Sequence, residues 1–181
     1  NAAAAIAACR VVGLSDDEIR AGLKSFPGLK HRMQPIARRD NVTFVNDSKA
    51  TNAEAAAPAL LSYENIYWIA GGRPKEGSLK VVEPHLGNVR HAYLIGEAAL
   101  EFSLALDSRV GFVISGDLAT AVKGASEQAK KDKLADAVVL LSPACASFDQ
   151  FTDFEARGNA FRDIIERLPG KHLDPFETPG L

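Results

Sequence analysis

The densest group of reactive side chains in this 181-residue chain is the segment Asn46–Asn52, which reads Asn-Asp-Ser-Lys-Ala-Thr-Asn. It follows an apolar run, Val42–Val45, that we predict to be a buried strand, and it precedes an alanine-rich stretch with a helical pattern. Ligands of open α/β sheets bind beyond the carboxyl ends of the strands, where backbone amides and helix N-termini are free. A carboxylate, an ammonium group and two hydroxyls are more than a turn requires, so we predict a ligand-binding site here.

A second candidate segment, Gly71–Gly77, follows the predicted strand Ile66–Ala70. Its two leading glycines let the backbone approach a ligand closely, and Lys75 offers a positive charge to an anion. The segment lacks the Gly-Lys-Ser/Thr of a Walker A loop, so nucleotide phosphates require another binding site. An ordinary loop with a solvated lysine is the alternative, and the segment taken alone favours that alternative.

A third candidate segment, Ser142–Phe151, follows the predicted strand Ala137–Leu141. Its small residues and hydroxyls permit tight packing around a bound group. Three aromatic rings in and after it can exclude water: Phe148, Phe151 and Phe154. Cys145 is a conceivable nucleophile, but no histidine lies near it in the sequence to act as a base. An inert, buried thiol is therefore the favoured interpretation of Cys145.

The pair His31-Arg32 follows a predicted hinge at Phe26–Leu29. The planar guanidinium of Arg32 suits a phosphate or a carboxylate, and a hinge would place it between two domains. A solvated surface arginine is an equally good interpretation of the sequence alone. The other histidines show no metal-ligand spacing: His85, His91 and His172.

The composition is that of one globular domain with a small appendage. Hydrophobic residues make up 46% of the chain and charged residues 24%, which is sufficient for a substantial core. A formal net charge of −2 without a long basic run argues against nucleic-acid binding. The run Ala2–Ala8 is too short to span a membrane, and the two cysteines lack CxxC spacing. We therefore expect a cytoplasmic protein with reduced thiols and no membrane partner.

The order of sequence patterns predicts an α/β fold. We expect strands at 33–37, 42–45, 66–70, 91–95, 110–115 and 137–141. We expect helices at 2–12, 16–24, 53–61, 79–86, 97–104, 118–131 and 154–168. A capping box formed by Ser15 and Glu18 is expected to open the second of these helices. This alternation predicts a Rossmann-like, mostly parallel sheet flanked by helices, with an antiparallel hairpin at one end and two short N-terminal helices. Residues after Pro169 are expected to form a poorly ordered tail.

Together, three motifs resemble the C-terminal domain of the Mur ligases, and in particular the members that add D-glutamate. They are Asn46–Asn52, Gly71-Gly72 with Lys75, and Ser142–Phe151 extended to Phe154-Glu155-x-Arg157-Gly158. The resemblance covers nearly the whole chain. It implies that residues 1–28 are closing helices of a central ATP-binding domain plus a hinge, that 29–170 form the C-terminal domain, and that 171–181 are a tail. Because the chain begins inside a helical pattern without a methionine, we expect it to be a piece of a longer protein.

The resemblance implies an ATP-dependent ligase of peptidoglycan biosynthesis. Such an enzyme joins D-glutamate to UDP-N-acetylmuramoyl-L-alanine through an acyl phosphate, with ATP and Mg²⁺. The phosphate-binding loop and most magnesium ligands of the family lie in the central domain, so we expect no metal ligands here and no ligase activity from the isolated chain. Two alternatives remain: a ligase of the same superfamily with another amino acid, such as a folylpolyglutamate synthetase-like enzyme, or a stand-alone nucleotide- or amino-acid-binding module.

The resemblance also implies roles for individual residues. D-glutamate is expected to contact Thr51, Lys75, Ser147, Phe148 and Phe154. ATP is expected to contact Asn1, Arg32 and Asp47. Catalytic roles are expected for His31 and Lys49. Two positions depart from the family pattern: Gln34, where an acidic residue is common, and Phe148, where some relatives have leucine.

Overall fold

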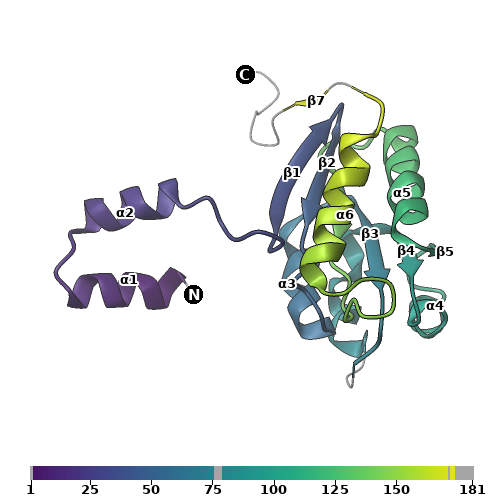
Figure 1. Ribbon diagram of the computed structural model, residues 1–181, viewed down its shortest axis with the longest axis horizontal. Coiled ribbons are helices and arrows are strands. Elements are labelled where there is room, and N and C mark those ends of the chain that lie inside the picture. The colour runs from purple at the N-terminus through teal and green to yellow at the C-terminus, as the bar shows by residue number, and fades with distance from the viewer. Residues whose placement is uncertain (1, 76–78, 171, 174–181) are drawn as a thin grey trace.

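The centre of the computed structural model is a seven-stranded sheet with the strand order β5-β4-β3-β6-β2-β1-β7 (Figure 1). The structure describes residues 2–75, 79–170 and 172–173. The strands are β1 Gln34–Arg39, β2 Val42–Asn46, β3 Ile66–Gly71, β4 Val89–Ile95, β5 Phe112–Gly116, β6 Ala137–Leu141 and β7 His172–Leu173. Strands β2, β6, β3, β4 and β5 are parallel to one another, whereas β1 pairs antiparallel with β2 and with β7. The predicted mostly parallel sheet with a terminal antiparallel hairpin is confirmed.

Strands β3 and β6 form the middle of the sheet and are buried at every residue. Their sequences, Ile66–Gly71 and Ala137–Leu141, are almost continuously apolar, as expected for strands covered on both faces. The edge strand β5 is more exposed, and its Val113 and Ile114 are about half exposed. The most apolar strands therefore lie where the sheet is most deeply covered.

Helices cover both faces of the sheet. They are α3 Ala53–Ser62, α4 Ala99–Leu106, α5 Leu118–Asp132 and α6 Phe154–Glu166. Helices α3 and α4 enclose one core cluster around Trp68, whereas α5 and α6 enclose a second cluster around Tyr67 and Phe161. In Figure 1, α5 and α6 lie in front of the sheet. Two separate cores thus fix the sheet between its helix layers.

The predicted helix at 79–86 is wrong. The chain forms two short 3-10 helices there, η1 Leu79–Val81 and η2 Glu83–Asn88. The physical reason is Pro84, which has no backbone N–H to donate and whose ring would clash with the preceding helical turn. The proline is tolerated at the start of η2, where the N–H is not needed.

The expected tail differs in one respect. Residues 172–173 form β7, whose backbone pairs with Arg38 and Arg39 of β1. The remaining tail residues, 171 and 174–181, lie outside the described part of the chain.

The first two helices stand apart from the sheet and are joined to it by an extended segment (Figure 1). They are α1 Ala2–Val11 and α2 Asp16–Ser25. The predicted capping box is confirmed: Ser15 Oγ accepts from Glu18 N, and the Glu18 carboxylate accepts from Ser15 N. Ile19 is buried in this pair, whereas Val11 is 87% exposed. Across the described ranges, no helix combines the length and apolar character needed to cross a bilayer.

Three helices that begin near one edge of the sheet have side-chain N-caps. Asn52, Asp117 and Asp153 accept hydrogen bonds from the backbone N–H groups three residues later, at 2.8, 2.9 and 2.6 Å. Each cap satisfies one of the free N–H groups of its helix, which typically contributes about 1 kcal/mol. The caps therefore fix where the preceding loops end, and two of those loops carry candidate site residues.

Candidate active site at the carboxyl ends of the strands

The three candidate segments lie side by side. Strands β2, β6 and β3 are neighbours in the sheet, and their parallel register places Asn46 beside Leu141 and Leu141 beside Ile69. The loops that follow these strands therefore leave the sheet at the same edge, the lower edge in Figure 1. We call this the site edge, made of residues 46–52, 71–75 and 142–154. Residues 76–78 of the second segment lie outside the described residues.

Asp47 is buried and holds two loops together. Its Oδ2 accepts from Ser142 Oγ at 2.8 Å, and its Oδ1 accepts from Met33 N at 3.1 Å. Burial raises the pKa of the Asp47 carboxyl, while the two hydrogen bonds and the charge of Arg32 act in the opposite direction. Arg32 itself is exposed. The structure thus brings together two of the three residues expected at ATP, and the third, Asn1, lies outside the described residues.

Asn46 and Ser48 form a buried polar layer behind the site edge. Asn46 Nδ2 donates to Gly158 O at 2.9 Å and lies 3.1 Å from His31 Nδ1, while Asn46 Oδ1 accepts from Ser48 N. Ser48 Oγ donates to Phe154 O at 2.8 Å. Fully paired buried groups of this kind hold a unique geometry, because leaving any one of them unpaired is costly. The layer fixes the loop after β2 to the start of α6.

Arg157 is the main residue that the sequence prediction missed. It comes from the first turn of α6, and only 1% of it is exposed. Its guanidinium donates to Ser48 Oγ and O at 3.0 Å, to Cys145 O at 3.1 Å and to Ala146 O at 3.3 Å. Burial lowers the pKa of Arg157 to about 10, so it remains a cation at neutral pH. Arg157 therefore ties the first candidate segment to the third.

A signal for Arg157 was present in the sequence. It lies three residues after Phe154, so both side chains start on the same face of the helix. What the sequence does not give is the partner set, because Ser48 is 109 residues away.

His31 belongs to the buried layer rather than to the open side of the site. Its ring packs against the Cα of Gly158, where any side chain would collide with it, and lies edge-on to Phe154 at 6.2 Å. Asn46 Nδ2 donates to Nδ1, so the proton of the neutral imidazole is on Nε2. Burial, followed by the charge of Arg162, lowers the pKa of His31. The resemblance implied a catalytic role for His31. Its buried position favours instead a role in holding Asn46 and Phe154 in place.

Lys49, by contrast, is exposed at the site edge. Its ammonium lies 3.8 Å from the centre of the Phe154 ring, and its backbone N–H donates to His31 O. Within the described ranges, no ion pair between Lys49 and a carboxylate is formed. A cation–π contact leaves the positive charge available to a ligand.

Thr51 and Lys75 lie at the same edge, on different loops. Lys75 is exposed and lines a narrow pocket of about 20 Å³, which has room for about one water. The pocket also contains Asn52, Glu101 and Cys145. A ligand the size of an amino acid would therefore lie along the open surface above the pocket rather than within it.

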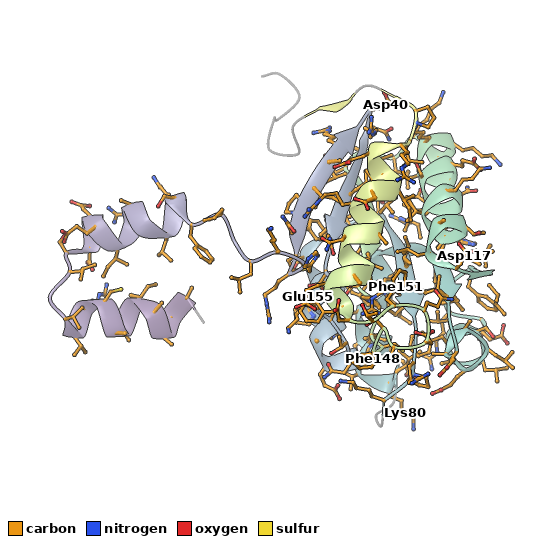
Figure 2. The ribbon with its side chains drawn as sticks, viewed as in Figure 1. Asp40, Lys80, Asp117, Phe148, Phe151 and Glu155 are labelled. Atoms are coloured by element: carbon orange, nitrogen blue, oxygen red, sulfur yellow. The ribbon has the colours of Figure 1, made fainter. Side chains whose placement is uncertain are left out.

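Two neighbouring residues of the third segment differ in exposure. Ser147 is buried, and its carbonyl accepts from Gln150 N and Phe151 N. Phe148 is 60% exposed. Figure 2 shows Phe148 and Phe151 close to the start of α6, in the same region as Glu155. The exposed ring of Phe148 thus directly follows the buried Ser147.

Cys145 has no nucleophilic geometry. It is 1% exposed, and burial raises the pKa of its thiol to about 12. The inert interpretation is supported by this burial. Among the residues that the structure describes, no group of three or more histidines, cysteines or acidic residues is arranged to hold a metal.

Comparison with known proteins places these features in a family. No protein-family profile matches the chain. It is 62% identical over 170 residues to the UDP-N-acetylmuramoylalanine--D-glutamate ligase of Agrobacterium fabrum, and 59% identical to that of Rhizobium etli. Both alignments cover 94% of this chain and 36% of the relative, so the chain spans a little over a third of the length of these relatives.

Two solved structures share the fold. A UDP-N-acetylmuramate-alanine ligase from Thermotoga maritima matches with a TM-score of 0.56 and 18% identity, covering 91% of this chain and 36% of that one. A bifunctional folylpolyglutamate synthase/dihydrofolate synthase from Yersinia pestis matches with a TM-score of 0.52 and 20% identity, over 84% of this chain and 35% of that one. These low identities support the fold alone. The high identity to the curated relatives, over nearly all of its residues, shows that the chain belongs to the Mur ligase family.

Proposed function

We propose that this chain is the part of a D-glutamate ligase that binds the incoming amino acid and closes one side of the ATP site. The parent enzyme would join D-glutamate to UDP-N-acetylmuramoyl-L-alanine in peptidoglycan synthesis, with ATP and through an acyl phosphate. The observation that carries the proposal is the convergence of Asp47, Lys49, Thr51, Lys75 and Ser147 at one sheet edge. Relatives that are about 60% identical and are named as D-glutamate ligases support the choice of amino acid.

The domain division follows from the same proposal. Residues 1–28 would be closing helices of a central ATP-binding domain plus a hinge, and 29–170 the C-terminal domain. The separation of α1 and α2 from the sheet supports this division (Figure 1). The exposed apolar side chains of Val11, Val12 and Phe26 also support it, because such residues normally pack against a neighbour.

The proposed task of the site edge is to hold a small dicarboxylate with its amine free. Lys75 would bind one carboxylate by a charge-assisted hydrogen bond, and the hydroxyls of Thr51 and Ser147 would help to orient the ligand. Lys49 adds a second positive charge near Phe154. The rings of Phe148 and Phe154 would exclude water from the acyl phosphate, which hydrolyses if it is exposed.

The amine of D-glutamate must lose its proton before it attacks the acyl carbonyl, and correct placement then supplies much of the rate. Lys49 and Lys75 favour the neutral amine, because nearby positive charges disfavour an ammonium ion. The rigid buried layer formed by Asn46, Ser48 and Arg157 keeps these groups in place. Binding and orientation are therefore what this chain would contribute to the reaction.

ATP would meet the other side of the same segment. Asp47 would accept hydrogen bonds from the ribose, Arg32 would approach the phosphates, and Asn1 would lie near the adenine. Magnesium, when bound, would neutralise phosphate charge. The described residues offer no cluster of metal ligands, and both oxygens of Asp47 are already hydrogen-bonded, so we place the magnesium ligands outside them.

The test is turnover by the full-length protein. We expect formation of the D-glutamyl product and ADP from UDP-N-acetylmuramoyl-L-alanine, D-glutamate and ATP, with L-glutamate as the matched control substrate. Residues 1–181 alone should give no turnover, since the phosphate-binding side of the site would be missing. A full-length protein that preferred another amino acid, or turnover by residues 1–181, would reject the proposal.

A further inference from the structure

We propose that Asp149 is a positioning residue that sets the spacing between the two sides of the amino-acid site. This inference rests on the function proposed above. Asp149 would act through Glu97 and Arg73, and the two sides are the loop that carries Lys75 and the loop that carries Ser147. No role in ligand contact is assigned to Asp149 itself.

The first link joins the two loops directly. Arg73 and Ala146 exchange both backbone hydrogen bonds, with Arg73 N to Ala146 O at 2.9 Å and Ala146 N to Arg73 O at 3.0 Å. Lys75 lies two residues beyond Arg73, and Ser147 directly follows Ala146. The pairing therefore brings the two proposed ligand contacts close to one another.

The second link joins the third loop segment to the end of β4. Asp149 Oδ2 accepts from Glu97 N at 3.1 Å. The same oxygen lies against the Cα of Gly96, where a Cβ would collide with both Asp149 and the backbone of Gly72. Gly96 has a φ of +67°, which also favours glycine. The absence of a side chain at Gly96 is what lets the carboxylate reach the amide.

The third link connects Glu97 back to Arg73. The Glu97 side chain accepts two hydrogen bonds from Arg73, at 3.2 Å from Nε and 3.1 Å from Nη2. This is the bidentate geometry that fixes orientation as well as distance. Both side chains are about half exposed, so the pair contributes little to stability on its own. Its importance lies in completing the network of Arg73, Ala146, Asp149 and Glu97.

A neighbouring contact strengthens the same loop. Gln150 Nε2 donates to Gly116 O at 2.7 Å, at the end of β5. The loop that carries Ser147 and Phe148 is thus held at consecutive residues by the ends of two further strands. No ligand is needed to explain the contacts of Asp149, because its carboxylate is used to orient protein backbone.

The experiment compares Asp149→Ala with Asp149→Asn in the full-length protein. Asparagine keeps an oxygen that can accept from Glu97 N, whereas alanine does not. We expect Asp149→Ala to raise the KM for D-glutamate roughly tenfold, with kcat and the KM for ATP changed less than about twofold, because small misplacements of binding groups are costly. Asp149→Asn should restore most of the lost affinity.

Asp117→Ala is the matched control. Asp117 caps α5 by accepting from Thr120 N and Thr120 Oγ1, and neither bond involves Arg73, Glu97 or Asp149. Its loss should lower stability without changing the KM for D-glutamate. Three outcomes would each overturn the positioning role. They are equal effects of the Ala and Asn variants of Asp149, an unchanged KM for D-glutamate in Asp149→Ala, and a rise in the KM for ATP equal to that for D-glutamate.

Two further readouts keep the outcomes separate. If Asp149→Ala does not fold, Glu97→Ala provides the test, because it removes the half-exposed ion pair with Arg73. We expect it to raise the KM for D-glutamate about threefold. An unchanged KM would show that the network does not position the site. A wild-type protein that does not use D-glutamate rejects the proposed function. In that case, hydrogen exchange of the Glu97 amide still tests the network. Asp149→Ala should speed this exchange, whereas Asp149→Asn and Asp117→Ala should not.

Discussion

The site edge and the residues packed behind it form two layers that differ in burial and in partners. The inner layer, made of His31, Asn46, Ser48 and Arg157, is buried, and each side chain has a partner within the protein. The outer layer, made of Lys49, Thr51, Lys75 and Phe148, is exposed or half exposed. Polar residues in one short segment therefore have separate tasks: the buried ones fix geometry, and the exposed ones are available to a ligand.

A substitution in the inner layer should cause the greatest loss of stability. Arg157→Met should lower the free energy of unfolding by about 3 kcal/mol, because it removes several hydrogen bonds and leaves buried carbonyls of Ser48 and Cys145 unpaired. Urea unfolding followed by circular dichroism measures it. The same change at Arg167, an exposed arginine at the end of α6, should cost less than about 0.5 kcal/mol. Equal losses at the two positions would contradict the division into layers.

A smaller effect concerns His31 and pH. Burial lowers the pKa of His31, so the unfolded chain binds a proton more readily than the folded chain. Stability should therefore be full above the unfolded pKa of about 6.5 and should fall as the pH drops below it toward the folded pKa.

The matched comparison is with His31→Gln, which cannot titrate. Unfolding free energies measured from pH 7.5 to 5.5 should fall less steeply in this variant than in the wild type. His91 also has a pKa lowered by burial, and it contributes equally to both proteins. Parallel pH curves for the two proteins would show that His31 is not held neutral by the inner layer.

The smallest expected effect on stability lies in the outer layer. Lys49→Met loses the cation–π contact with Phe154, which contributes about 0.5 kcal/mol at an exposed position. Thermal unfolding should therefore be almost unchanged. A loss of unfolding free energy as large as that of Arg157→Met would show that Lys49 belongs to the inner layer.

Much of the fold could be predicted from local patterns. Continuous apolar runs marked β3 and β6, and the capping box marked the start of α2. The helix expected at 79–86 does not form, because Pro84 prevents a continuous α-helix despite the apolar spacing around it. Local rules therefore worked where neighbouring residues decide the structure.

The site could be predicted only in its outer layer. The strand-end rule indicated Lys49 and Lys75, because it depends on the order of strands and loops. Arg157 binds Ser48 and Asn46 binds Gly158 across more than 100 residues of sequence, and no local pattern encodes such contacts. The catalytic role expected for His31 came from the resemblance alone, whereas its burial against Gly158 depends on the folded chain.

If the outer layer binds the amino acid substrate, Lys75→Ala in the full-length protein should weaken the binding of D-glutamate specifically. Steady-state kinetics should show a rise of at least about tenfold in the KM for D-glutamate, as expected for the loss of one charge-assisted hydrogen bond. The KM for ATP should stay within about twofold of the wild type, and Lys131→Ala, on the exposed surface of α5, should change neither value. An equal rise in both KM values, or no rise in either, would show that Lys75 does not bind the amino acid substrate.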